Sequence, residues 1–241
     1  QRISARTWLR TLDDTLGLSQ EEALRRKDRP QSTLPAVEPL LADQPWHHID
    51  RQPRDMLPAD PRWGFTMRMP ALLYDQGELH NLTVERGTLT DEDRYKINEH
   101  IVQTEVMLTQ LPFPPHLRRV PEIAGGHHEK MDGTGYPKGL DKSRLSLEAR
   151  MLAIADIFEA LTATDRPYKK GKTLSEAVTI MARLRDQNHI DPDLFEVFLR
   201  QGVHLAYAQR FMAPALVDEV DVEAMLLTPG LAAPHHNTAP A

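Results

Sequence analysis

The chain has 241 residues, no cysteine and a formal net charge of -6 at neutral pH. Because cysteine is absent, disulfides and thiolate metal sites are excluded, and any metal site must use histidine and carboxylate ligands. The acidic balance argues against a broad surface for a nucleic acid polymer, and no apolar run approaches the roughly 20 residues that cross a bilayer.

Residues 1–70 differ in composition from the rest of the chain. The pattern predicts a helix over about 4–16 and a second helix from Ser19, where Glu22 completes a capping box. Eight prolines between residues 30 and 70 interrupt helical structure. We therefore interpret 1–70 as a Pro-rich, irregular amino-terminal appendage or insertion.

Alternating residues over 79–85 predict a short strand that ends at Gly87. From residue 88 the pattern is helical, with Thr90 as N-cap of a helix over 91–110. A Gly-rich loop is expected over 133–139. Further helices are predicted over about 115–127, 147–163, 173–185, 191–202 and 203–212. The expected fold class is all-α, with a main domain over 71–213 and a carboxy-terminal tail over 214–241.

Side chains that ligate metals stand where a helical core would favour carbon. His100 is expected on the apolar side of the 91–110 helix, and His127 and His128 lie side by side at a helix end. Asp156 interrupts the most apolar helix, where an unpaired carboxylate is costly to bury. A divalent cation would compensate it, and imidazoles with carboxylates suit Fe, Mn, Zn or Ni rather than Ca or Mg.

Taken singly, each of these residues also has a structural explanation. His100 alone is more often a satisfied interior or surface histidine, and adjacent histidines are often a polar turn. Asp156 alone could bond to a helix N-terminus. The residues that surround them decide between the two interpretations.

Two segments carry a family resemblance. The segment HHEKMDGTGYP at 127–137 and the segment ADIFEALTATDRPYKK from residue 155 resemble the HD-GYP family, whose signature is HHExxDGxGYP. This family is a branch of the HD superfamily of metal-dependent phosphohydrolases. The resemblance extends from about Gly87 to Leu199 and implies the helical bundle of that superfamily.

The resemblance implies a function and a set of site residues. Cyclic di-GMP would be the substrate, hydrolysed to pGpG or GMP at a site with two or three divalent ions, Fe or Mn first among them. The implied metal ligands are His100, His127, His128 and Asp156. The implied substrate-binding residues are Lys130, Tyr136, Arg166 and Lys169. Glu129 and Asp132 are expected to orient the histidines, and the loop residues Gly133, Gly135 and Pro137 to shape the site.

The sequence departs from the family at the HD pair, a His-Asp dipeptide that bridges the metals. Counting back from His100 by the usual interval reaches Ala71 and Leu72, and no His-Asp dipeptide occurs in the chain. Either the pair lies upstream of Gln1, or it has been lost. The absence of an initial Met and the intact downstream ligands favour the first explanation. On that explanation the 241 residues alone are expected to be inactive.

Two rival functions stay open. One is a non-enzymatic signalling module that binds a partner such as a diguanylate cyclase (GGDEF) domain. The other is hydrolysis of a different nucleotide or phosphate ester by the same fold. An upstream sensor domain and a cytoplasmic location, with or without a tether to a membrane sensor, complete the expectations.

Overall fold

The computed structural model describes residues 6–12, 16–27, 33–39, 41, 43, 47–85, 87–164 and 171–227. The chain forms two compact units. Unit 1 comprises residues up to Asp60 together with Arg68–Glu99, and unit 2 comprises Pro61–Met67 together with the residues from His100 onward. Each unit is described by itself below.

Unit 2 is helical. Within its described residues the α-helices are α4 (His100–Thr109), α5 (Val120–Gly125), α6 (Leu147–Thr162), α7 (Leu174–Asp186), α8 (Pro192–Arg200), α9 (Val203–Phe211) and α10 (Val222–Leu227). Short 3-10 helices cover Pro61–Trp63, Pro115–Leu117 and Pro214–Leu216. The predicted all-α class is confirmed.

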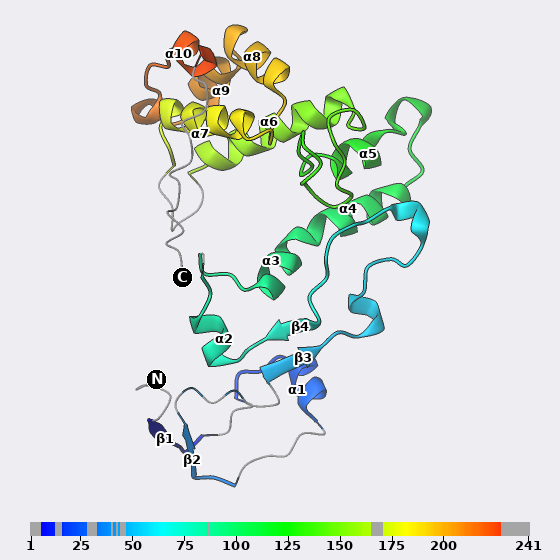
Figure 1. Ribbon diagram of the computed structural model, residues 1–241, viewed down its shortest axis with the longest axis vertical. Helices are drawn as coiled ribbons and strands as arrows, with labels where there is room; N and C mark the ends of the chain where they lie inside the picture. Colours follow the sequence, from blue (N-terminus) through cyan, green and yellow to red (C-terminus); the bar gives the residue numbers. More distant parts are fainter. Residues whose placement is uncertain are drawn as a thin grey trace, which may run out of the picture. The chain divides into compact units, whose positions relative to one another are not determined.

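Helix α6 is the element around which unit 2 packs. Ser146 caps it by accepting a hydrogen bond from the N–H of Ala149, as the sequence predicts. Figure 1 shows α5 against one end of α6, and α7 and α8 against the other. Ile154 and Phe158 of α6 lie in the main apolar core, which α7, α8 and α9 complete. This packing holds the middle of α6, and with it Asp156, in a fixed place.

A buried carboxylate joins α6 to α8. Asp191 has a fully buried side chain that caps α8 through the N–H groups of Asp193 and Leu194. Arg150 of α6 and Lys142 donate to the same carboxylate. Burial alone would raise the pKa of Asp191, but the hydrogen bonds from these two cations outweigh it and lower the pKa.

Within its described residues, unit 1 contains two short antiparallel sheets and three helices. Strands β1 (Thr7–Arg10) and β2 (Ala36–Pro39) form one pair, and β3 (His48–Asp50) and β4 (Leu72–Asp75) form the other. The helices are α1 (Gln20–Arg26), α2 (Glu78–Leu82) and α3 (Asp91–Asn98), with a 3-10 turn at Pro53–Asp55. The predicted capping box of Ser19 and Glu22 is confirmed at the start of α1.

Two predictions for unit 1 are wrong. The described part of the expected 4–16 helix contains strand β1, which pairs with β2 and is held to it by a hydrogen bond from the Arg10 side chain to the carboxylate of Glu38. The expected strand over 79–85 is replaced by α2, because the Asn81 side chain donates to the backbone carbonyl of Gly77 and stabilises a helical turn. Both errors arise because the stabilising contacts are made with residues outside the segments from which the elements were predicted.

The helix expected over 91–110 is divided. Thr90 caps α3 as predicted, but α3 ends at Asn98 and α4 begins at His100, at the boundary between the units. Ile97, expected on a shared apolar face with His100, is 53% exposed. No Gly or Pro marks the break between α3 and α4, so the sequence pattern does not predict it.

The carboxy-terminal part of unit 2 was also predicted only in part. Helix α10 was missed, and its residues Val222, Met225 and Leu226 pack against the main core. Of the tail predicted over 214–241, residues 228–241 lie outside the described residues. None of the helices in the described ranges combines the length and apolar character needed to cross a membrane.

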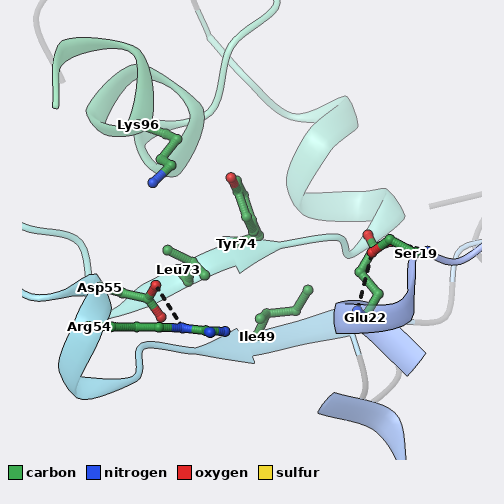
Figure 2. Close-up of a pocket in the computed structure, with 8 residues that line it drawn as sticks. All are labelled: Ser19, Glu22, Ile49, Arg54, Asp55, Leu73, Tyr74 and Lys96. Atoms are coloured by element: carbon green, nitrogen blue, oxygen red, sulfur yellow. Dashed lines mark hydrogen bonds and ion pairs between the residues drawn. The ribbon is translucent and has the colours of Figure 1, made fainter. Parts of the chain in front are cut away.

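A cavity of about 520 Å³ lies within unit 1, between β3, β4, α1 and α3 (Figure 2). It is lined by Ser19, Glu22, Ile49, Arg54, Asp55, Leu73, Tyr74 and Lys96. Lys96 donates to Glu99 at 2.7 Å, and Glu22 and Asp55 accept the N–H groups of Ser19 and Gln52. Because Lys96, Glu22 and Asp55 already have partners, they do not indicate which kind of ligand the cavity could bind.

The Asp191 cluster generates a prediction about stability. Asp191→Asn keeps an oxygen that can cap α8 but leaves Arg150 and Lys142 facing a neutral group. We expect the free energy of unfolding to fall by about 3 kcal/mol, the scale for breaking a buried ion pair. Chemical denaturation at neutral pH measures this change.

The matched control is Asp193→Asn. Asp193 also accepts from Lys142, at 2.8 Å, but its side chain is 84% exposed, so less than about 1 kcal/mol is expected. Because the folded-state pKa of Asp191 is lowered, its contribution is present above the unfolded-state value of about 4 and is lost at lower pH. The gap between wild type and Asp191→Asn should therefore narrow below about pH 4. Equal effects of the two variants at neutral pH would contradict the role given to Asp191.

Candidate metal centre

Three histidines converge in unit 2. His100 is the first residue of α4, and His127 and His128 lie in the turn that follows α5. Each offers a ring nitrogen, and these three atoms all lie within 4.8 Å of one another. His100 is exposed and the other two are partly buried, so the cluster is open to solvent on one side.

The hydrogen bonds of these rings fix which nitrogen is available. His127 Nδ1 lies 2.6 Å from the carbonyl oxygen of Ala124. Because a carbonyl only accepts, Nδ1 carries the hydrogen and Nε2 keeps its lone pair. The Nε2 atoms of His100 and His128 lie 3.2 Å apart. Two nitrogens bound at about 2.1 Å to one ion are separated by a similar distance, so this spacing fits shared coordination.

The electrostatics also suit metal binding. Burial, together with the neighbouring His127 and His100, lowers the pKa of His128 to about 4. His128 is therefore a neutral imidazole near pH 7, which is the form that ligates metals. Its ring stacks on that of Tyr136, with centroids 4.9 Å apart and planes 17° from parallel.

Asp156 projects from the middle of α6 and is partly buried. Its charge opposes the lowering of the pKa of His128 and contributes to the raised pKa of Tyr136, so the carboxylate lies near both rings. It does not join the group of three within 4.8 Å. Among the described residues none donates a hydrogen bond to it. A carboxylate beside lone-pair nitrogens, with no donor of its own, is the arrangement that a cation would stabilise.

Two glycines bring the helices of the site together. A Cβ atom on Gly125 would lie 2.7 Å from a carboxylate oxygen of Glu105 in α4. A Cβ atom on Gly126 would lie 3.0 Å from the Cβ of Ala149 in α6. The pair Gly125-Gly126 therefore lets α5 approach both helices closely and places His127 and His128 beside His100.

Comparison with known proteins agrees with this arrangement. The sequence profile of a family described as HD domain matches residues 35–194. The chain belongs to the HD domain family. Proteins of this family are metal-dependent, which fits the donor set of imidazoles and a carboxylate. The family resemblance that the sequence carries is thereby confirmed.

Several curated bacterial relatives are similar to this HD domain. A 3'3'-cGAMP-specific phosphodiesterase of Vibrio cholerae is 38% identical over 151 residues, which is 61% of this chain and 31% of the relative. A cyclic di-GMP phosphodiesterase of Pseudomonas aeruginosa is 36% identical over 135 residues, 55% of this chain and 31% of the relative. A cyclic di-GMP phosphodiesterase of Vibrio cholerae is 30% identical over 224 residues, 84% of this chain and 44% of the relative. The chain thus spans less than half the length of these relatives.

The loop that follows the histidines is held by Glu129. This residue is fully buried, and its two carboxylate oxygens accept the N–H groups of Lys138 at 2.7 Å and Leu140 at 2.9 Å. Asp132 accepts both the N–H and the hydroxyl of Thr134. Both carboxylates therefore stabilise the loop itself. Their expected role in orienting the histidines stays a prediction.

Further contacts fix the loop on the rest of unit 2. Lys138 forms an ion pair with Glu105 of α4 and lies over the ring of Phe65. The carbonyl of Pro137 accepts the N–H of Thr66 at 2.8 Å. These contacts set the position of Tyr136, one residue before Pro137, against His128.

Other predicted site residues are distributed as follows. Lys130 and Tyr136 lie in or beside this loop and are partly buried. Arg166 and Lys169 lie outside the described residues. His189 was not singled out in the sequence, although it lies near His128 and Lys130. Only its place in HIDPDLF, within the resembling stretch, could have drawn attention to it.

The geometry of the cluster predicts its metal dependence. His127→Ala and His128→Ala should each weaken binding of Mn²⁺ or Fe²⁺ by at least about tenfold, because each removes one neutral nitrogen donor. Metal content after dialysis, measured by mass spectrometry, checks this. His116→Ala, at an exposed position in the 3-10 helix Pro115–Leu117, is the control and should keep the wild-type content. Equal metal content in all of these variants would count against the site.

The loop generates a prediction about its glycines. A Cβ atom on Gly135 would overlap the backbone of Glu129 and Lys130. We expect Gly135→Ala to lower the free energy of unfolding by about 3 kcal/mol, at the upper end of overpacking effects. Gly133→Ala serves as the control, since Gly133 has φ +78° but its nearest atom would be 3.5 Å away. That change should cost about 1 kcal/mol. Denaturation curves distinguish the two, and a milder effect of Gly135→Ala would contradict the packing described.

Proposed function

We propose that this HD domain is the metal-binding part of a phosphodiesterase that hydrolyses cyclic dinucleotides, with cyclic di-GMP as substrate and pGpG or GMP as product. The observation that carries the proposal is the convergence of His100, His127 and His128 beside Asp156. The names of the relatives, cyclic di-GMP and 3'3'-cGAMP phosphodiesterases, support the substrate class. Among the rival phosphohydrolase substrates, cyclic dinucleotides are therefore favoured.

We propose His100, His127, His128 and Asp156 as the ligands of a divalent metal site. The donor set lacks thiolates and favours iron or manganese, and two or three ions are expected in the complete site. Divalent ions bound there would lower the pKa of a water molecule and offset charge on the phosphate. His128 contributes a ring that is neutral near pH 7, and His127 contributes the tautomer that Ala124 fixes.

The loop residues would bind and orient the substrate. Tyr136 is held parallel to His128, and burial, followed by the charge of Asp156, raises the pKa of its hydroxyl. The hydroxyl therefore stays protonated at neutral pH and can donate a hydrogen bond to a phosphate oxygen. Lys130 would add positive charge beside a phosphate of the substrate. Arg166 and Lys169 are proposed for the same task from the sequence alone.

A non-catalytic binding module is the second candidate function. The family match covers residues 35–194, yet the chain contains no His-Asp dipeptide. In unit 1, Asp75 follows Tyr74 rather than a histidine. Its carboxylate accepts the N–H of Gly77 at 2.9 Å and lies 3.6 Å from His48 and 3.8 Å from His80. The Asp75 carboxylate therefore already has partners. The second candidate function is dinucleotide binding without hydrolysis. A diguanylate cyclase domain as partner and an upstream sensor stay predictions.

Turnover by the complete protein tests the proposal. The protein is loaded with Mn²⁺ or Fe²⁺ and given cyclic di-GMP or 3'3'-cGAMP, and products are separated by chromatography. We expect hydrolysis that falls by at least about a hundredfold in His127→Ala and Asp156→Asn, the scale for loss of charge stabilisation in the transition state. His116→Ala should match wild type.

Each remaining outcome decides between the candidates. Tight dinucleotide binding without hydrolysis would overturn the enzyme and favour the binding module. If the protein neither binds nor hydrolyses these dinucleotides but hydrolyses another nucleotide, the proposed substrate class is wrong. Full hydrolysis by both site variants would overturn the site.

A further inference from the structure

His189 lies in the turn between α7 and α8, far in sequence from the three clustered histidines. Its N–H donates to the carbonyl of Leu184 at 2.8 Å, and the preceding Asn188 has φ 54°, a left-handed conformation that turns the chain sharply. The next residues, Ile190 and Asp191, are fully buried. The backbone at His189 is therefore held firmly on both sides.

The same turn is tied to the loop that carries Lys130. Asp191, two residues after His189, accepts a hydrogen bond from the ammonium of Lys142. The N–H of Lys142 in turn donates to the carbonyl of Met131 at 3.1 Å, next to Lys130. These two hydrogen bonds connect the turn that contains His189 with the loop that contains Lys130, although the two segments are far apart in sequence.

The imidazole of His189 is partly buried among charged loop residues. Burial lowers its pKa, the charge of Lys130 lowers it further, and Asp132 acts in the opposite direction. His189 also acts on His128 of the metal cluster. Near pH 7 the ring is neutral and keeps one N–H donor. The side chain therefore lies near both Lys130 and His128 and offers an uncharged N–H donor.

We propose that His189 is a further substrate-binding residue, which together with Lys130 binds the phosphate that is not being cleaved. The inference rests on the proposed function, because a cyclic dinucleotide carries two phosphates and the histidine cluster accounts for only one. Lys130 supplies the charge for the second phosphate and His189 a directed N–H. One oxygen of Asp132 accepts both the N–H and the hydroxyl of Thr134, and no hydrogen bond joins its carboxylate to the His189 ring.

A comparison of two substrates tests this role in the complete, metal-loaded protein. Cyclic di-GMP has a second phosphate, whereas bis(p-nitrophenyl) phosphate has only the scissile one. His189→Leu should reduce the ratio of kcat/KM for cyclic di-GMP to kcat/KM for bis(p-nitrophenyl) phosphate by about tenfold, the loss expected for one hydrogen bond to a charged group. Most of the change should appear in KM. His189→Gln, which keeps an N–H donor, should recover much of the ratio.

Controls separate this inference from the proposed function. Metal content should equal that of wild type in both variants, and Lys130→Gln should lower the same ratio independently of His189. His116→Leu should leave the ratio unchanged. A wild-type ratio in His189→Leu, or equal losses on both substrates, would overturn the role of His189. Failure of wild type to hydrolyse cyclic di-GMP would instead overturn the proposed function. Where wild type binds without turnover, the dissociation constant for cyclic di-GMP replaces the ratio, with the same expectation.

Discussion

The close approach of α5 to α4 and α6 is the constraint on which the candidate site depends. Gly125 and Gly126 add no side chain of their own between these helices, so the turn after α5 can present His127 and His128 next to His100. A Cβ atom at Gly126 would lie 3.0 Å from the Cβ of Ala149 in α6, and one at Gly125 would meet the carboxylate of Glu105 in α4. The site is thus a consequence of helix packing, and its ligands are held by rigid elements.

The charges around the cluster follow from the same packing. Burial and the neighbouring His127 and His100 lower the pKa of His128, so this imidazole resists protonation. Asp156 arrives from α6 with no donor among the described residues. Neutral nitrogens beside a carboxylate form an environment that a divalent ion completes. The loop clamped by Glu129 adds Tyr136 and Lys130 to one side of this environment.

Features with local causes could be predicted from the sequence. The caps Ser19, Thr90 and Ser146 all accept the hydrogen bonds expected of them, because a cap depends on residues within one turn. The pairing of β1 with β2 could not be predicted, since it joins segments more than 20 residues apart through contacts such as Arg10 with Glu38.

The candidate site divides in the same way. The motif at 127–137 pointed to His127, His128 and the loop, whereas the convergence of His100 on them required the packed helices. His189 was missed because its relation to Lys130 passes through Asp191 and Lys142, two contacts of tertiary structure. This relation depends on the burial of Asp191, and the sequence alone does not show that this acidic residue is buried.

Anomalous diffraction from crystals of the manganese- or iron-loaded protein would test the central claim most directly. We expect an anomalous-difference peak at the metal's absorption edge, within about 2.1 Å of Nε2 of both His100 and His128. His127 and Asp156 should lie around the same ion or a neighbouring ion. A peak elsewhere, or these side chains turned away from a metal that is bound by other residues, would contradict it.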